Sequence, residues 1–342
     1  MSQPKPEPGQ PLRPDRLEVS VAIPCYNEQD TINLLLSALY AQTYPREKME
    51  VVIADGLSSD DTKLRIAEFQ EKHPDLLVRI VENPARTIPA GLNQAIRSAC
   101  GALIVRLDAH SVPDPDYVAN CVKALEDGKG DSVGGVWEIR PRGSGWMARA
   151  IALAAAHPLG IGDAQYRFTR EAQFVDTVPF GAFRRSLVDE IGPFDEGLLT
   201  NEDYEFNARL RQAGGRIWLD PSIRSVYFAR PNLLELARQY WRYGYWKARM
   251  LRRYPGTIRW RQALPPLFVF SLFASALVAP WWSYAGWIFV LESSVYAAIL
   301  MLVGLQMAWR KRDPTLVVGI PLAIAVMHIA WGSAFLWSLF LG

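Results

Sequence analysis

The chain has 342 residues, of which 50% are hydrophobic and 21% are charged, and its net charge of +2 gives no sign of a nucleic-acid partner. This length accommodates one sizeable α/β domain together with further segments. The three cysteines stand far apart and form no CxxC pair, which disfavours a zinc site or a disulfide framework and favours buried thiols in a reducing compartment. They are Cys25, Cys100 and Cys121.

Short apolar runs alternate with helical patterns along the first third of the chain. Residues 1–16 are rich in Pro and charge, lack the apolar core of a signal peptide and are expected to form a disordered tail. Strands are then expected at residues 19–23, 51–54, 76–81 and 103–107, with helices at residues 31–41, 63–72 and 90–99. This alternation predicts an α/β fold with an open, mostly parallel sheet and helices on both faces.

Polar side chains gather in the loops that follow three of these strands. Tyr26 and Glu28 follow the first strand, Asp55 follows the second, and Asp108 and His110 follow the fourth. Loops at the carboxyl ends of parallel strands meet at one crevice, so these groups can share a ligand. No GxGxxG follows the first strand and no GxxxxGK[ST] occurs, which disfavours a dinucleotide dehydrogenase and a P-loop NTPase. Asp55 can still accept hydrogen bonds from a base or a ribose.

The pair Asp108 and His110 is a candidate metal site. In extended backbone the two side chains project from the same face, where a carboxylate and an imidazole can hold a divalent ion. The alternative is a polar loop in which His110 caps a local group, because motifs this short also arise by chance.

Two helices are expected in the second half of the chain, after strands at residues 134–138 and 174–183. The first begins at Asn201-Glu202-Asp203 and ends at Gly214-Gly215, and its acidic start also suits the helix dipole for purely structural reasons. The second, residues 232–254, is amphipathic and basic, which favours a position at a membrane surface over a simple solvated face. Its basic residues are Arg238, Arg242, Lys247, Arg249, Arg252 and Arg253.

Three long apolar stretches occupy residues 264–284, 286–309 and 316–341. Each approaches the ~20 residues needed to cross a bilayer, and Trp residues cluster at their ends, so spans are favoured over a buried helical hairpin. Basic residues precede the first stretch and separate the second from the third, which places the N-terminal domain in the cytoplasm and the C-terminus outside. Glu292, inside the second stretch, is either a functional contact or an interfacial residue.

Residues 19–243 contain five motifs that, in this order, resemble those of inverting family-2 glycosyltransferases of GT-A fold. They are PCYNE, ADGLSSDDT, RLDAHS, NEDYEFNARLRQAGG and QYWRY. The DAH in place of DxD, the segment VDTVPFGAFRR and the three C-terminal stretches are similar to the succinoglycan-type ExoA branch of that family.

The resemblance implies a donor site in the first half of the chain. The nucleoside would be cradled by Pro24, Tyr26, Glu28 and Asp55. Asp108 and His110 would bind a divalent metal that bridges the donor diphosphate. Because one ligand is an imidazole, Mn²⁺ is favoured over Mg²⁺. Phosphate contacts are expected from Arg86, Arg106 and Arg242, with a solvated loop residue as the alternative for Arg86.

The resemblance also implies an acceptor site. Asp203 would remove the proton from the acceptor hydroxyl, with Glu202 as a weaker second candidate. Gly181 would allow close approach of the acceptor, and Gln239 and Trp241 would contact it. Tyr243 stands where the QxxRW motif of processive members has Trp.

These expectations combine into a multi-pass enzyme of the inner (plasma) membrane. Residues 17–230 would form a cytoplasmic GT-A domain, residues 231–262 an interfacial helix region and residues 263–342 a transmembrane domain. The enzyme would transfer sugar from a nucleotide-sugar, with UDP favoured, to a polyprenyl-diphosphate-linked glycan in exopolysaccharide or envelope-glycan assembly. An oligomer is compatible with the sequence. The alternatives are a processive polysaccharide synthase and a catalytically inactive membrane scaffold.

Overall fold

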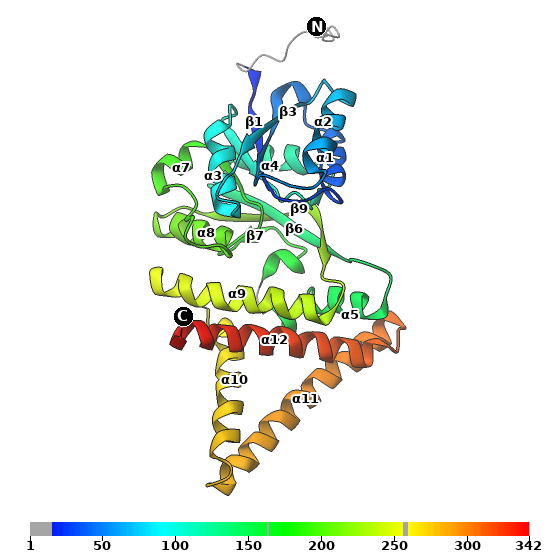
Figure 1. Ribbon diagram of the computed structural model, residues 1–342, viewed down its shortest axis with the longest axis vertical. Helices are drawn as coiled ribbons and strands as arrows, with labels where there is room; N and C mark the ends of the chain where they lie inside the picture. Colours follow the sequence, from blue (N-terminus) through cyan, green and yellow to red (C-terminus); the bar gives the residue numbers. More distant parts are fainter. Residues whose placement is uncertain (1–15, 163, 256–258, 342) are drawn as a thin grey trace. The chain divides into compact units, whose positions relative to one another are not determined.

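A computed structural model describes residues 16–162, 164–255 and 259–341 (Figure 1). The expected tail therefore lies outside the described residues, apart from residue 16, as do residues 256–258 of the expected interfacial region and residue 342. The chain forms two compact units. The first unit comprises Met1–Gly135, Gln173–Glu196 and Arg209–Ser225, and the second comprises Val136–Ala172, Gly197–Ala208 and Val226–Gly342.

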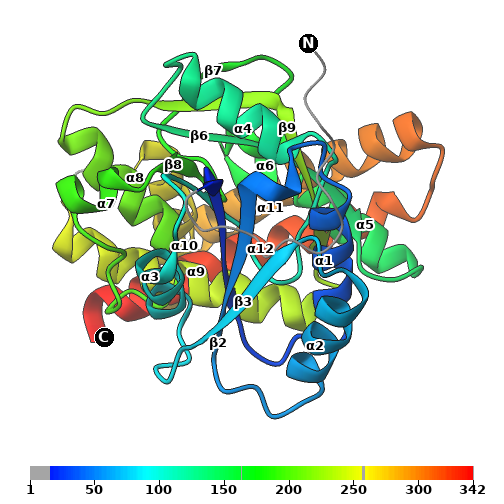
Figure 2. The same ribbon diagram turned by 90° about the horizontal axis from the view of Figure 1, so that it is seen from above.

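The first unit is built on four parallel strands in the order β3-β2-β1-β4. Their bounds are Val19–Cys25 for β1, Met49–Asp55 for β2, Leu77–Glu82 for β3 and Leu103–Arg106 for β4. The connecting helices are α1 (Ile32–Tyr40), α2 (Thr62–Lys72) and α3 (Ile88–Ser98), and α4 (Tyr117–Glu126) follows β4. Figure 2 shows β2 beside β3, with α3 on one side of these strands and α1 and α2 on the other. Every residue of β1, β2 and β4 is buried, which explains why they read as continuous apolar runs.

The rest of the sheet departs from the parallel pattern. β8 (Ala182–Arg184) is antiparallel to both β4 and β6 (Ser132–Pro141), and the sheet continues through β9 (Ile217–Ala229) to β5 (Val112–Pro113). The strand expected at residues 174–183 is instead two short strands, β8 and β7 (Gln173–Phe174), the latter paired with β9. The sheet is therefore mixed. A buried apolar run identifies a strand but carries no information about its direction.

The cysteine prediction is correct for two of the three residues. Cys25 and Cys121 are buried free thiols, and burial raises the pKa of both. Cys100 is exposed, which contradicts the prediction. It follows the end of α3, where the chain turns at the surface, and lies 3.3 Å from the Arg79 guanidinium.

The second unit contains four long helices at its C-terminal end. They are α9 (Leu233–Arg253), α10 (Trp260–Val278), α11 (Ser283–Lys311) and α12 (Leu316–Leu341). Shorter elements precede them: α5 (Trp146–Ala154), α6 (Pro158–Ile161) and the turn η3 (Gln165–Arg167). By length and composition, α10, α11 and α12 could each cross a membrane, in agreement with the three predicted stretches. Figure 1 shows α10 and α11 converging at one end, whereas α12 lies alongside α9.

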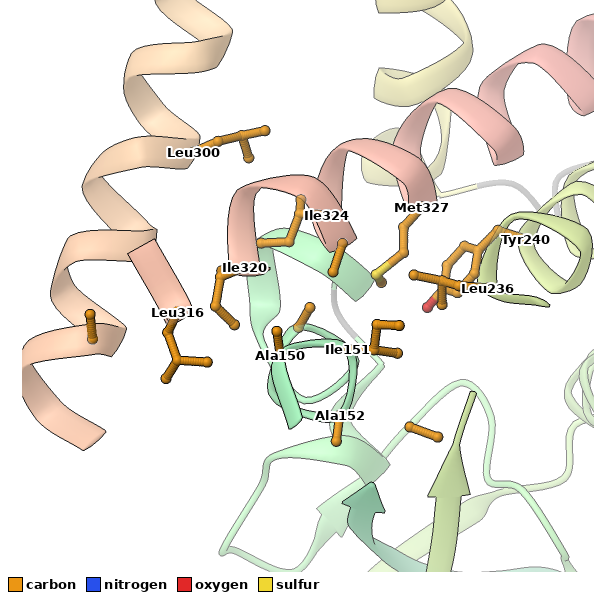
Figure 3. Packing of buried hydrophobic residues seen from close by; sticks show 14 residues of the cluster. Ala150, Ile151, Ala152, Leu236, Tyr240, Leu300, Leu316, Ile320, Ile324 and Met327 are labelled. Atoms are coloured by element: carbon orange, nitrogen blue, oxygen red, sulfur yellow. The ribbon is translucent and has the colours of Figure 1, made fainter. Parts of the chain in front are cut away.

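Protein covers α12 far more than it covers α10 or α11. In its apolar stretch 44% of the residues are buried, against 11% in each of the other two helices. Figure 3 shows the cluster responsible, which joins Leu236 and Tyr240 of α9 to Ile324 and Met327 of α12 and to Ile151 of α5. Lipid is thus not needed to cover this face of α12, because α9 and α5 already do so.

Helices α9 and α12 run in the same direction. Gly244 of α9 faces the backbone of Trp331, and near the end of α9 the Arg252 guanidinium donates to the carbonyls of Ser338 and Leu339, the latter at 2.8 Å. Arg252 is exposed, whereas Lys247 is buried, with its Nζ 3.5 Å from the centre of the Tyr204 ring. Two of the six basic residues expected at a membrane surface therefore make contacts within the second unit.

Replacing Gly244 by alanine is expected to lower the unfolding temperature. A Cβ at this position would lie 2.2 Å from the carbonyl oxygen of Trp331, so α9 and α12 would have to separate. Overpacking of this kind costs about 1–3 kcal/mol. The matched control is Gly286→Ala in α11, where the nearest atom is the Cβ of Ala279 at 3.7 Å and alanine favours the helix. Thermal unfolding in detergent should separate the two variants, and equal melting temperatures would contradict the close contact.

Candidate active site

In the first unit, the register of β1 and β2 brings two candidate loops together. Cys25 pairs with Asp55, so the loop after β1 lies beside the loop after β2. Asp55 is fully buried, and its carboxylate accepts from the Ser58 backbone N–H at 3.1 Å and lies 3.3 Å from Lys63 Nζ. The carboxylate is thereby fixed by its own loop and by the start of α2.

Tyr26 and Arg86 meet at the same edge of the sheet. The Arg86 guanidinium lies 5.7 Å from the centre of the Tyr26 ring, and both side chains are exposed. Arg86 has a φ of 56°, in the left-handed region, so its loop turns sharply at this residue. The pair presents an aromatic face and a positive charge side by side, a combination suited to a base and a phosphate.

Glu28 joins the first of these loops to the DAH segment. Its Oε1 lies 3.1 Å from Nδ1 of His110, and its Oε2 accepts a hydrogen bond from the Thr31 hydroxyl. His110 is therefore oriented by a carboxylate from another loop, although 82 residues separate the two in sequence. A carboxylate on one ring nitrogen of histidine fixes its orientation and raises its basicity as a ligand.

Arg106 holds the carboxylate of Asp108. Its Nη2 lies 3.0 Å from Asp108 Oδ1, and its guanidinium lies 4.9 Å from the centre of the Phe180 ring. The Arg106 side chain is only 2% exposed. Its expected contact with a phosphate stays a prediction. The side chain of Asp108 is 21% exposed and stays accessible to a ligand. Arg106 thus positions Asp108.

The described residues contain no group of three or more His, Cys, Asp or Glu side chains arranged to hold a metal. Asp108 and His110 offer two donors, an oxygen and a nitrogen. Such a set fits an ion that takes its other ligands from water and substrate phosphates, which is how Mg²⁺ is usually held in phosphate-transfer sites. The donor set therefore fits a metal shared with a diphosphate and does not fit a closed structural site.

In the second unit, Glu202 and Asp203 begin α8 (Glu202–Gln212). Glu202 is buried, whereas Asp203 is half-buried and so has access to a small hydroxyl. The residue before them, Asn201, has a φ of 70°, and its side-chain amide donates to the Tyr243 carbonyl of α9 at 3.4 Å. The acidic start of α8 is thereby tied to the QYWRY segment.

The QYWRY side chains divide between interior and surface. Gln239 is buried and donates to the hydroxyls of Tyr227, at 2.8 Å, and Tyr243, at 2.9 Å. Trp241 and Arg242 are exposed.

Gly181 belongs to the first unit, and a Cβ there would lie 2.9 Å from Ser132 Oγ. Strand packing therefore already requires a small residue at this position. The roles of these residues in acceptor and phosphate binding stay predictions.

Two comparisons establish the family. The family described as Glycosyl transferase family 2 matches residues 20–192. The succinoglycan biosynthesis protein ExoA of Rhizobium meliloti is 32% identical over 320 residues, which cover 92% of this chain and 93% of that protein. The chain belongs to glycosyltransferase family 2.

Two further relatives of this family-2 glycosyltransferase match over nearly their whole length. One is the dolichyl N-acetyl-α-D-glucosaminyl phosphate 3-β-D-2,3-diacetamido-2,3-dideoxy-β-D-glucuronosyltransferase of Methanococcus voltae, 27% identical over 91% of this chain and 93% of that protein. The other is the structure of a mannosyltransferase from Pyrobaculum calidifontis in complex with GDP-Man and Mn²⁺. It has a TM-score of 0.60 and 25% identity, and the match covers 98% of this chain and 91% of that one. The GT-A fold and the glycosyltransferase class inferred from the motifs are confirmed.

The glycosyltransferase also contains a cluster that sequence reasoning missed. In the second unit Arg167 is surrounded by Trp137, Tyr166 and Tyr227, with its guanidinium 5.1–5.6 Å from the ring centres. The only signal in the sequence was the abundance of Trp and Tyr. No spacing rule links these residues, because they come from β6, η3 and β9.

Proposed function

We propose that this family-2 glycosyltransferase moves a sugar from a nucleotide-sugar, with UDP favoured, to a polyprenyl-diphosphate-linked glycan at the cytoplasmic face of the plasma membrane. The observation that carries this proposal is the gathering of Glu28, Asp55, Asp108 and His110 in loops that follow parallel strands of one unit. The named relatives support a role in exopolysaccharide or envelope-glycan assembly, since one is a succinoglycan biosynthesis protein and the other is named for a dolichyl-phosphate-linked acceptor.

The donor is proposed to bind to the first unit. Pro24, Tyr26, Glu28 and Asp55 would surround the nucleoside. Asp108 and His110 would hold a divalent ion, with Mn²⁺ favoured; when bound, it supplies positive charge to the leaving diphosphate. Arg106 keeps the Asp108 carboxylate in place, and Glu28 orients His110. Arg86 and Arg242 are proposed to contact phosphates.

The acceptor reaction is proposed to use Asp203 as the base. Its carboxylate would take the proton of the acceptor hydroxyl as that oxygen attacks the sugar carbon opposite the leaving group. One such displacement inverts the sugar carbon and needs no covalent enzyme intermediate. Glu202 is the second candidate, but its burial leaves it less accessible to an acceptor.

Membrane attachment is proposed to depend mainly on α10 and α11, whose apolar residues are largely exposed. The catalytic part, residues 17–230, and the helix region 231–262 would lie on the cytoplasmic side, in agreement with the basic residues before α10 and after α11. Because α12 packs along α9, we place the C-terminal end on that same side. An external C-terminus, as expected from the sequence, is the alternative to this arrangement.

Labelling of cysteines in sealed vesicles should test this arrangement. A membrane-impermeant maleimide is expected to label Leu341→Cys from the same side as the native exposed Cys100, and Ser283→Cys, before α11, from the opposite side. The two introduced cysteines would be made in a Cys100→Ser background, where the remaining thiols are buried. Labelling of Leu341→Cys together with Ser283→Cys would show instead that α12 crosses the bilayer.

A transfer assay tests the proposed function itself. The full chain in nanodiscs would be given radiolabelled UDP-sugars and GDP-sugars, with Mn²⁺ or Mg²⁺ and bacterial lipid extract. We expect one sugar to enter the lipid phase with release of one nucleoside diphosphate. Long polymer would favour the processive alternative. No transfer from any donor would contradict the proposal and favour the scaffold alternative.

A further inference from the structure

Arg167 lies in an aromatic cage in the second unit. Trp137 and Tyr227 are stacked on each other with ring centres 4.5 Å apart, and Tyr166 meets Trp137 edge-on at 5.0 Å. The guanidinium of Arg167 faces all three rings. It donates to the Ala155 carbonyl at 3.2 Å.

The positive charge of Arg167 has no carboxylate partner among the described residues. Its buried Nε has no hydrogen-bond acceptor among the described residues. Burial raises the pKa of Tyr240 and Tyr243, so both phenols stay neutral at physiological pH. Within the part of the chain that the structure describes, the cage therefore surrounds a cation that no carboxylate neutralises.

Burying a cation without a partner of opposite charge costs free energy unless another group pairs with it. Aromatic faces attract the charge but cannot accept the remaining N–H bonds. An anion with several acceptor oxygens would supply both the opposite charge and these acceptors. The planar guanidinium of arginine can donate two parallel hydrogen bonds to a phosphate. The ammonium group of lysine cannot do this.

The neighbourhood of the cage indicates where that phosphate comes from. Tyr227, one of the rings of the cage, also packs against the buried cluster that includes residues of α9 and α12. Figure 3 shows that cluster. Arg167 thus lies against the layer of helices that continues into the apolar helices α10 and α11. A phosphate attached to a lipid can reach this layer while its hydrocarbon chain stays in the bilayer.

We propose that Arg167, within Trp137, Tyr166 and Tyr227, is the anchoring site for the phosphate that links the acceptor glycan to its lipid. This inference rests on the lipid-linked acceptor of the proposed function. Gln239 then acts as a positioning residue, because its amide fixes the hydroxyls of Tyr227 and Tyr243 beside the cage. The aromatic rings hold the guanidinium in one orientation, and the phosphate supplies the missing charge.

Binding of a simple lipid phosphate tests the site without any sugar transfer. Farnesyl diphosphate and farnesol would be titrated calorimetrically into the full chain in nanodiscs of neutral lipid. The wild type is expected to bind the diphosphate at least about tenfold more tightly than the alcohol, because a charge-assisted contact is among the stronger hydrogen bonds. Arg167→Gln should lose this preference. The control Arg170→Gln, at an exposed position three residues away, should keep it.

Arg167→Lys and nucleotide titrations distinguish an acceptor-phosphate site from a donor-phosphate site or a purely structural arginine. Arg167→Lys keeps the charge but loses the planar fork, so it should retain part of the preference and tests the site even if the glutamine variant fails to fold. Binding of UDP and GDP with Mn²⁺ should be unchanged in Arg167→Gln. A loss of nucleotide affinity would assign Arg167 to the donor phosphates and overturn the inference. So would a wild type that binds farnesol as tightly as the diphosphate. Since none of these measurements needs turnover, their failure is distinct from failure of the transfer assay.

Discussion

Asp203→Asn is expected to abolish sugar transfer while leaving donor binding intact. Asparagine has nearly the same shape as aspartate but cannot take a proton, and loss of a general base typically lowers the rate by about 10²–10⁴-fold. The loss should appear in kcat, because the proton moves during the chemical step. Steady-state transfer of labelled sugar to lipid acceptor, with calorimetric titration of the nucleotide, measures both quantities.

Asp189→Asn is the matched control for this experiment. Asp189 is likewise an aspartate in the first turn of a helix, α7 (Ser186–Ile191), and it is exposed. The same substitution there should leave kcat within about twofold, in keeping with ordinary surface changes. If Asp203→Asn retained most of its activity while Glu202→Gln lost it, the base would be Glu202. If both variants stayed active, the base would lie elsewhere.

Asp108→Asn is expected to weaken metal-dependent donor binding strongly. The substitution removes the carboxylate proposed to hold the ion and also breaks the ion pair between Asp108 and the buried guanidinium of Arg106. Changes to groups that orient metal ligands already cost about 10–100-fold in metal affinity, so loss of the ligand should cost at least as much. Titration of nucleotide release against Mn²⁺ should show a higher midpoint and a lower plateau. The unfolding temperature should also fall, because the ion pair that Asp108 makes with the buried guanidinium of Arg106 is lost.

The control for this second experiment is Asp116→Asn. Asp116 is exposed just before α4, and its carboxylate accepts from the Thr43 hydroxyl, which an asparagine oxygen can also do. Metal titration and unfolding temperature should match the wild type. An Asp108→Asn enzyme with an unchanged Mn²⁺ midpoint would remove Asp108 from the metal site and leave it a purely structural partner of Arg106.

The donor half of the site was largely predictable because it depends on local patterns. Each buried strand is a continuous apolar run, and parallel strands end at the same edge, so the positions of Asp55 and Asp108 follow from the sequence. The sequence indicated that the loops carrying Glu28 and His110 lie near each other. It did not indicate that these two side chains pair, because that depends on loop geometry. The ion pair between Arg106 and Asp108 was not predicted, because residue types alone do not show that the Arg106 guanidinium is buried against this carboxylate.

The second unit was less predictable because its contacts join distant segments. Hydropathy identified α12 as long and apolar enough to cross a membrane, but it could not show that α9 and α5 cover this helix. The aromatic cage is assembled from three separate segments around Arg167, and no periodicity marks such a site. Strand direction in the second part of the sheet was also not predictable, because the residue pattern of a short strand such as β8 is the same for parallel and antiparallel pairing.

The pairing of α9 with α12 has a consequence for biogenesis. The ribosome completes α9 well before α12, because α10 and α11 are translated between them. Until α12 emerges, the side of α9 at Leu236 and Tyr240 lacks the cover that this helix later gives it, and only earlier segments such as α5 can pack there. Formation of this non-local contact is accordingly a late step in maturation. A nascent chain stopped after α11 would already contain the exposed apolar helices α10 and α11. Such a chain could therefore be inserted in the membrane before α9 has packed against α12.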